Sequence, residues 1–366
     1  MLFGSGETSP SGRKVFDRLL QQLRQPPHIA LLETPAGFEL NSAQVAGRVA
    51  EFMRKSLQNF APSIQVIPAR MRGTPFSPDE PAIVSPLLEA DLIFLGPGSP
   101  TYAARQLRHS LAWHILVARH RLGAALALAS AATIAISNCA LPVYEIYKVG
   151  EDIHWKEGLN FFCLYGLDLV FIPHWNNREG GAELDTSHCF MGEARFNRLY
   201  DMLPGETTVV GLDENTALWI DFAQATCQVF GAGSVTLLHT AADRLWRNHS
   251  DRQTAAIHPP GAQPAINRRV YHNLESFPLA ELGSYRAYQP EATLPTEVWQ
   301  QALETHARLA ANPTIEPPPE VLALVQQREA ARQQKDWPAS DALRSQITAL
   351  GWQVKDSPDG PVLTPR

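Results

Sequence analysis

The chain has 366 residues, 45% of them apolar, and a formal net charge of −6. This composition provides for a large buried core and carries no whole-chain signature of nucleic-acid binding, although a local basic surface stays open. The four cysteines form no C-x-x-C pair and offer no zinc-ligand spacing, so we predict no metal and no cofactor. No apolar stretch is long enough to span a bilayer and no signal peptide is recognisable, so we expect a cytoplasmic protein without a membrane partner.

The first three residues, Met1-Leu2-Phe3, read as a very short strand before Gly4. Parallel strands usually run about five to six residues. We therefore expect the natural start to lie upstream; a stub tolerated by its neighbours is the alternative. The following stretch, 4–9, is similar to a dinucleotide loop, but its sixth position is Ser9 and no acidic partner follows the second strand. A Rossmann cofactor site is therefore rejected.

Strand-like and helix-like patterns then alternate over the first two thirds of the chain. Amphipathic stretches, such as the one through Val45, Val49 and Met53, separate short aliphatic runs. This alternation is typical of a doubly wound parallel sheet, which makes the predicted fold class α/β. The predicted strands are 29–33, 64–69, 92–95, 124–129, 167–172, 209–212, 217–221, 227–230 and 234–238.

Ser130 is the most informative residue of the chain. An apolar run over 124–129 precedes it, and a stretch of small, helix-compatible residues follows over 131–135. A serine at a turn from strand to helix projects its hydroxyl above the sheet edge, where N–H groups of the helix start can hold an oxyanion. Such turns usually carry glycines where this chain has Leu128 and Ala132, so a buried serine that caps a helix is the alternative.

Two further apolar runs end on residues that can serve this serine. One ends on His174 and the other on Glu214, each at the C-terminal end of a predicted strand. A nucleophile, a base and an orienting acid at one edge of a parallel sheet are what acyl transfer requires. The glycine loop over 96–100 adds the N–H of Gly98, which with that of Ala131 makes a candidate oxyanion hole. Taken singly, each feature also fits a solvated histidine, a hairpin turn or a tight turn.

The last third of the chain is predicted to divide into two parts. Residues 246–316 are polar and proline-dotted, with a break at 258–261 and one helix that begins at Thr296. After Pro317–Pro319, a helix over 320–335 leads to a second helix capped by Asp336, with Gly351 at its C′ position, then a short strand and a turn over 357–360. The predicted domains are 1–245, 246–316 and 317–366.

Six stretches of residues 1–240 resemble the cyanophycinase and aspartyl dipeptidase family, peptidase family S51. These stretches are 4–7, 94–98, 129–132, 171–174, 195–199 and 211–217. The resemblance implies a flavodoxin-like, class I glutamine amidotransferase-like fold and a serine-type hydrolase with Ser130 as nucleophile, His174 as base and Glu214 as orienting acid. It also implies a small peptide or amide substrate, with a bond next to an acidic residue as one candidate.

The last fifty residues resemble a different protein, the extreme C-terminus of cysteinyl-tRNA synthetases, over 328–337, 340–344, 350–352 and 355–360. The HIGH and KMSKS motifs of a synthetase are absent from the sequence, so cysteine activation is not implied. The resemblance instead implies an RNA-facing or partner-facing surface; a solvated helical hairpin is the alternative. The candidate basic residues of this surface are Arg328, Arg332, Lys335 and Arg344.

Two functions are therefore compatible with the sequence. The first is a serine hydrolase that cleaves a peptide or amide bond through an acyl-enzyme. The second is a catalytically inactive scaffold that binds tRNA or a translation partner through its synthetase-like tail. The sequence identifies neither the substrate nor the oligomeric state.

Overall fold

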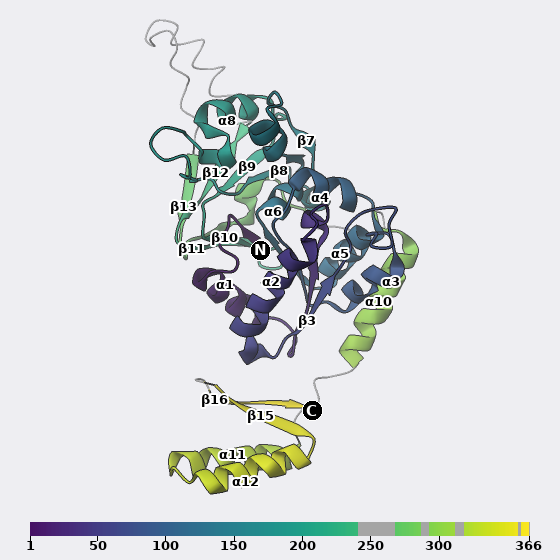
Figure 1. Cartoon of the computed structure of the whole chain (residues 1–366), viewed down its shortest axis with the longest axis vertical. Helices are drawn as coiled ribbons and strands as arrows, with labels where there is room; N and C mark the ends of the chain where they lie inside the picture. Colours follow the sequence, from purple (N-terminus) through teal and green to yellow (C-terminus); the bar gives the residue numbers. More distant parts are fainter. Residues whose placement is uncertain (241–267, 287–292, 312–317, 358–359, 366) are drawn as a thin grey trace, which may run out of the picture.

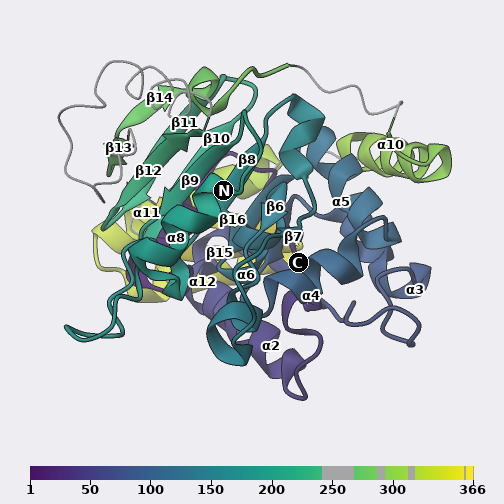
Figure 2. The same cartoon turned by 90° about the horizontal axis from the view of Figure 1, so that it is seen from above.

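A central eight-stranded sheet organises the larger part of the chain (Figures 1 and 2). The computed structural model describes residues 1–240, 268–286, 293–311, 318–357 and 360–365. The strand order is β14-β11-β10-β1-β5-β4-β2-β3, in which β1, β5, β4, β2 and β3 pair in parallel, whereas the pairs β1–β10, β10–β11 and β11–β14 are antiparallel. The strands are β1 Leu2–Phe3, β2 His28–Leu32, β3 Ser63–Ile67, β4 Leu92–Leu95, β5 Ala125–Ala129, β10 Thr216–Asp221, β11 Thr226–Gly231 and β14 Ser276–Pro278.

A second sheet of four strands has the order β13-β12-β9-β8. Its strands are β8 Leu169–Ile172, β9 Thr208–Leu212, β12 Ser234–His239 and β13 Arg268–His272. The sequence analysis placed the strands before Ser130, His174 and Glu214 in one sheet, and this detail is wrong. The antiparallel strand β10 occupies the second edge of β1, and β9 pairs instead with β8 on one side and β12 on the other. A small third sheet joins β6 Cys139–Ala140 and β7 Lys156–Glu157.

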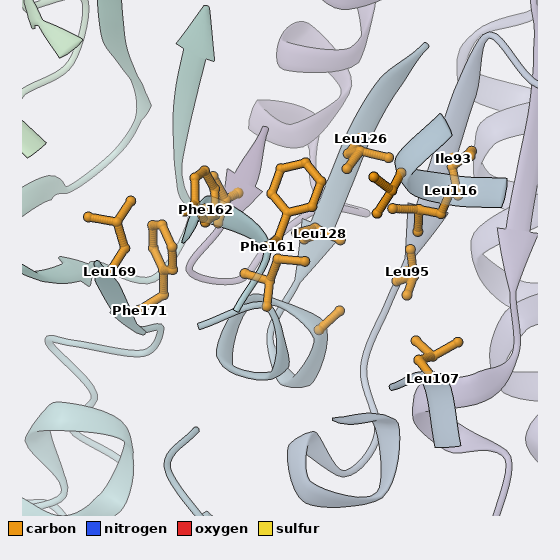
Figure 3. Packing of buried hydrophobic residues seen from close by; sticks show 14 of the residues in the cluster. Ile93, Leu95, Leu107, Leu116, Leu126, Leu128, Phe161, Phe162, Leu169 and Phe171 are labelled. Carbon is orange, nitrogen blue, oxygen red and sulfur yellow. The ribbon is translucent and has the colours of Figure 1, made fainter. Parts of the chain in front are cut away.

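Helices cover both faces of the central sheet, as its alternating side chains require. Leu92 and Phe94 of β4 face a layer that contains α1 and α2, whereas Ile93 and Leu95 face the opposite layer around α5. Figure 3 shows part of this second layer, in which leucines of β4 and β5 lie with Phe161 and Phe162. The helices are α1 Pro10–Leu20, α2 Ser42–Ser56, α3 Pro81–Val84, α4 Pro100–Leu107, α5 Leu111–Arg121, α6 Ala131–Ala135, α7 Ser187–Phe190, α8 Gly192–Asp201 and α10 Thr296–Ala311.

The predicted α/β architecture is confirmed, and each of the nine predicted strands overlaps an observed one. The helix predicted to begin at Thr296 is α10. The break at 258–261 and the proposed boundaries near 246 and 316 lie outside the described residues, so the domain limits stay predictions, as does an upstream start. In the described part of the chain, no helix combines the length and apolar character needed to cross a bilayer.

The C-terminal module consists of two helices and a strand pair (Figure 1), and it has its own small core. It contains α11 Pro319–Gln333, α12 Trp337–Ala349 and the antiparallel pair β15 Trp352–Ser357 and β16 Gly360–Pro365. The Asp336 side chain caps α12 by accepting from the Ala339 N–H, and Gly351 follows the helix with a φ of +82°, as predicted. Residues 358–359 of the predicted turn lie outside the described residues. The core residues are Val321, Val325, Ile347, Trp352 and Val354.

One of the four basic residues assigned to an RNA-facing surface is buried instead. The Arg328 side chain is 1% exposed, and its guanidinium donates two hydrogen bonds, of 2.6 and 2.9 Å, to the Asp356 carboxylate. Arg332 and Arg344 also form ion pairs with Asp356. The prediction for Arg328 is therefore wrong, because a carboxylate 28 residues further along the chain neutralises it inside the module.

Candidate active site

Ser130 lies at a strained turn between β5 and α6. Its φ of 51° and ψ of −108° are unusual for a residue other than glycine, and such backbone strain persists mainly at functional sites. The hydroxyl does not cap α6. It lies instead 3.2 Å from Nε2 of His174, which argues against the helix-cap alternative.

The turn is compatible with a leucine two residues before the serine. Leu128 is 3% exposed and points into the hydrophobic layer of Figure 3, so its side chain lies among core residues. Ala132 is small enough to pack in the same layer. Thr133, which the sequence analysis did not single out, donates to the carbonyls of Phe3 and Leu128 at 3.0 Å each and ties the turn to β1.

His174 follows β8 and joins the two sheets. Its backbone N–H donates to the carbonyl of Gly4, which follows β1, at 3.2 Å, and its φ is 51°. The imidazole ring contacts both other residues, because Nε2 lies 3.2 Å from Oγ of Ser130 and Nδ1 lies 3.0 Å from Oε1 of Glu214. The structure therefore brings Ser130, His174 and Glu214 together, although β5 belongs to one sheet and β8 and β9 to the other.

Two neighbouring asparagines hold Glu214 in place. Asn177, which is 2% exposed, donates from Nδ2 to Oε1 of Glu214 at 2.9 Å, and the Glu214 N–H donates to Oδ1 of Asn176 at 2.9 Å. Burial alone would raise the pKa of the Glu214 carboxyl, but the hydrogen bonds from Asn177 and His174 outweigh it and hold this pKa below its ordinary value. The carboxylate is therefore ionised at neutral pH.

A left-handed turn in α7 supports the histidine from behind. His188, Cys189 and Phe190 have φ values of 55°, 58° and 67°, so the backbone here is not that of a right-handed helix. The N–H of Cys189 donates to the His174 carbonyl at 3.2 Å, and that of His188 donates to the Trp175 carbonyl at 2.8 Å. The sequence analysis missed this turn, since none of the three residues is a glycine.

The two predicted oxyanion donors lie at the same site. Gly98 and Ala131 line a cavity of about 340 Å³ together with Ser130 and His174. Gly98 has a φ of +146°, and a Cβ at this position would collide with the Pro35 carbonyl, so the loop requires glycine. Among the described residues, neither the Gly98 N–H nor the Ala131 N–H has a hydrogen-bond partner.

The described residues hold no cluster of three or more histidine, cysteine, aspartate or glutamate side chains suited to a metal ion. The site brings together a serine hydroxyl, an imidazole, a carboxylate and two residues with unpartnered N–H groups among those described. These are the components of general-base-assisted acyl transfer.

Comparison with known proteins divides the chain into two parts. Among solved structures, a peptidase from an acI-B1 Actinobacterium is similar with a TM-score of 0.55 and 20% identity, covering 76% of this chain and 95% of that chain. At this identity the likeness establishes the fold alone. The larger part of this chain has the fold of a peptidase.

The tail is similar to a part of cysteine–tRNA ligases. A family model described as "Cysteinyl-tRNA ligase anticodon binding domain" matches residues 316–360. The cysteine–tRNA ligase of Chlamydia felis is 48% identical over 48 residues, which is 13% of this chain and 10% of that protein. That of Methanosarcina acetivorans is 52% identical over 44 residues, which is 12% of this chain and 9% of that protein. The chain thus spans about a tenth of the length of the curated relatives it matches.

Proposed function

We propose that this protein is a serine hydrolase of the S51 type that cleaves a peptide or amide bond through an acyl-enzyme. The observation that carries the proposal is the chain of contacts from Ser130 Oγ to His174 Nε2, at 3.2 Å, and from His174 Nδ1 to Glu214 Oε1, at 3.0 Å. Ser130 lines a cavity that Gly98 and Ala131 also line, and the N–H groups of these two residues have no hydrogen-bond partner among the described residues. A peptidase fold at low identity is compatible with this chemistry and does not by itself establish it.

In the proposed first half-reaction, Ser130 Oγ forms a bond to the substrate carbonyl carbon while His174 Nε2 takes the hydroxyl proton. The carbonyl electron pair moves to oxygen, where the N–H groups of Gly98 and Ala131 stabilise the negative charge. When this pair returns to carbon, the C–N bond breaks and the imidazolium gives its proton to the leaving amine. An ester then links the acyl group to Ser130.

In the second half-reaction, water takes the place of the amine. His174 accepts a proton from water as the water oxygen forms a bond to the ester carbon, whose carbonyl electron pair moves to oxygen. When this pair returns, the bond between the acyl carbon and Ser130 Oγ breaks, the carboxylic acid is released, and the imidazolium returns the proton to Ser130 Oγ. Glu214 remains ionised throughout, because hydrogen bonds from Asn177 and His174 keep its pKa below the ordinary value. Its role is to hold the imidazole through Nδ1–H and to stabilise the imidazolium.

A fluorophosphonate probe tests this proposal, because it reacts with an activated serine and not with an ordinary one. We expect stoichiometric labelling of the wild type at Ser130 and none of Ser130→Ala. Ser345→Ala, a change of a serine on α12 whose hydroxyl only donates to the Asp341 carbonyl, is the matched control and keeps the labelling. Absence of labelling in the folded wild type would refute the proposal.

A second function is favoured by one observation in the tail. Because the anticodon-binding model matches residues 316–360, we propose that the C-terminal module binds RNA independently of hydrolysis. Arg332, Arg344 and Lys335 supply cationic side chains near its surface, whereas Arg328 does not, since it is buried. A mobility shift with a tRNA transcript tests this. If a chain shortened after residue 311 still binds the tRNA transcript, the C-terminal module is not the RNA-binding part and this proposal is wrong.

A further inference from the structure

The cavity beside Ser130 has an apolar interior. Ile134, Val143 and Cys189 are 2%, 7% and 3% exposed and belong to one hydrophobic cluster. The rings of Tyr147 and Phe190 lie 5.1 Å apart at its wall, and the Phe190 ring lies 6.4 Å from that of His174. An apolar surface therefore extends up to the base of the triad.

The charged side chains of this cavity are at its exposed rim. Among the described residues that line it, Lys148 is the one lysine or arginine, and it is exposed, as is the acidic Glu179. Burial and the nearby charge of Glu214 raise the pKa of the Cys189 thiol to about 12, so this group is neutral at pH 7. Among the described residues, the buried part of the lining thus offers no cation to a carboxylate, and the one lysine of the lining, Lys148, is exposed.

We propose, on the basis of the proposed function, that the substrate residue whose carbonyl is attacked carries an uncharged apolar or aromatic side chain. Ile134 lies three residues after Ala131 on α6 and therefore on the same side of the helix. An acyl group whose oxygen binds the Ala131 N–H places its neighbouring side chain toward Ile134 and Val143. An acidic side chain would lose its hydration there without gaining a buried cation, because the described lining offers it tyrosine hydroxyls and the exposed Lys148 instead. The site thus differs from the acidic preference that the family resemblance implies.

Paired phosphonate probes test this inference without a known substrate. N-acetylated diphenyl phosphonates that carry the side chain of phenylalanine or of aspartate react with an activated serine and differ only in the group offered to the cavity. We expect the phenylalanine analogue to label Ser130 about tenfold faster or more, the equivalent of one unpaired buried charge. Equal labelling rates, or faster labelling by the aspartate analogue, would overturn the inference.

The fluorophosphonate probe separates this failure from failure of the proposed function. If Ser130 reacts with the fluorophosphonate but shows no preference for the phenylalanine analogue, the hydrolase proposal survives and the side-chain preference is wrong. If Ser130 reacts with none of the three probes, both are wrong.

A substitution that increases labelling by the aspartate analogue gives a second test. An unfolded variant cannot gain reactivity, so misfolding cannot produce the expected result. Tyr147 lies at the wall of the cavity, so Tyr147→Arg supplies the missing cation, and we expect it to raise labelling by the aspartate analogue about tenfold. Val149→Arg is the matched control. Both residues belong to the π-helix Glu145–Val149, so this change adds the same charge two residues further along, at a side chain that is 73% exposed and does not line the cavity. An identical gain in both variants would attribute the effect to overall charge and overturn the inference.

Discussion

The candidate active site and the C-terminal module each contain a hydrogen-bonded cluster of charged or polar side chains, yet the two clusters differ in what they leave unpaired. In the module, Arg328 is buried and its guanidinium is paired with Asp356. At the candidate site, Ser130 and His174 occupy strained backbone conformations beside a cavity that Gly98 and Ala131 also line, and the N–H groups of these two residues have no hydrogen-bond partner among the described residues. The Asp356 contact neutralises a buried charge and so stabilises the fold of the module, although the buried Arg328 Nε has no partner among the described residues. Strained backbone beside a cavity, in contrast, is found mainly at functional sites.

We expect the largest effect from a substitution that weakens the contact between His174 and Glu214 in the candidate active site. Glu214→Gln keeps the shape of the side chain but removes the charge that orients His174, and we expect kcat to fall by about 10⁴-fold. Steady-state hydrolysis of the best dipeptide or ester found for the wild type measures this. Glu206→Gln, at an exposed position before β9, is the control and leaves kcat unchanged. A loss smaller than tenfold in the Glu214 variant would mean that this carboxylate does not serve the histidine.

The next effect concerns the oxyanion donors. Gly98→Ala forces a methyl group against the Pro35 carbonyl at a φ of +146°, so the loop and its N–H must move. We expect kcat to fall by about 10²–10³-fold, the usual cost of one lost oxyanion donor. Gly73→Ala is a matched control, because that glycine also has a positive φ, of +74°, but no atom within 4 Å of the added methyl. Equal loss of activity in both variants would point to backbone strain and not to the donor.

A smaller effect distinguishes the hydrogen bond to the Glu214 carboxylate from the hydrogen bond that the Glu214 backbone N–H donates. Asn177→Ala removes the donor that lowers the Glu214 pKa, so this pKa rises and the acid limb of the kcat/KM profile moves to higher pH. The expected loss near neutral pH is about five- to tenfold, the worth of one hydrogen bond. In the control, Asn176→Ala removes only the acceptor for the Glu214 N–H and leaves the acid limb in place. An acid limb that does not move in Asn177→Ala would exclude Glu214 as the titrating group.

The ion pair of the tail is tested by stability and not by rate. Asp356→Asn removes the charge of the carboxylate to which Arg328 donates two hydrogen bonds and leaves Glu329, 3.1 Å away, as its acidic partner. We expect the module to lose about 1–3 kcal/mol of stability, since Asp356 itself is partly exposed. Hydrogen exchange of residues 318–357 in the full chain measures this. Asp341→Asn, at an exposed position on α12, is the control. Unchanged exchange in the Asp356 variant would contradict a stabilising role for the pair.

The same pair gives a pH dependence whose sign follows from its pKa shift. The hydrogen bond from Arg328 lowers the pKa of Asp356 below its ordinary value of 3.8, so the native module binds the proton less readily than the unfolded one. The stability that the pair contributes is therefore present above pH 3.8 and is lost as the pH falls through the lower native value. At neutral pH no change with pH is expected.

Ser130, His174 and Glu214 could be singled out because each follows an aliphatic run, although these runs belong to two sheets and not, as predicted, to one. The support around them could not be predicted. The contact of Asn177 with Glu214 spans 37 residues, and the left-handed turn at 188–190 carries no glycine that would mark it. Arg328 was misassigned for a related reason, because a basic residue on an amphipathic helix looks exposed until its distant partner is known.

The smallest expected effect is that of removing the tail. If the module only stabilises itself and binds a partner, a chain that ends at residue 311 should keep its fluorophosphonate labelling rate within about twofold, as expected for a separate domain. The residues that line the cavity lie between Gly98 and Phe190, and the triad ends at Glu214, so no described residue of the tail contributes to them. A thermal melt of the shortened chain shows whether it is folded. If the shortened chain is folded but its Ser130 no longer reacts, the tail contributes to the active site. The conclusion that the two clusters act independently would then be wrong.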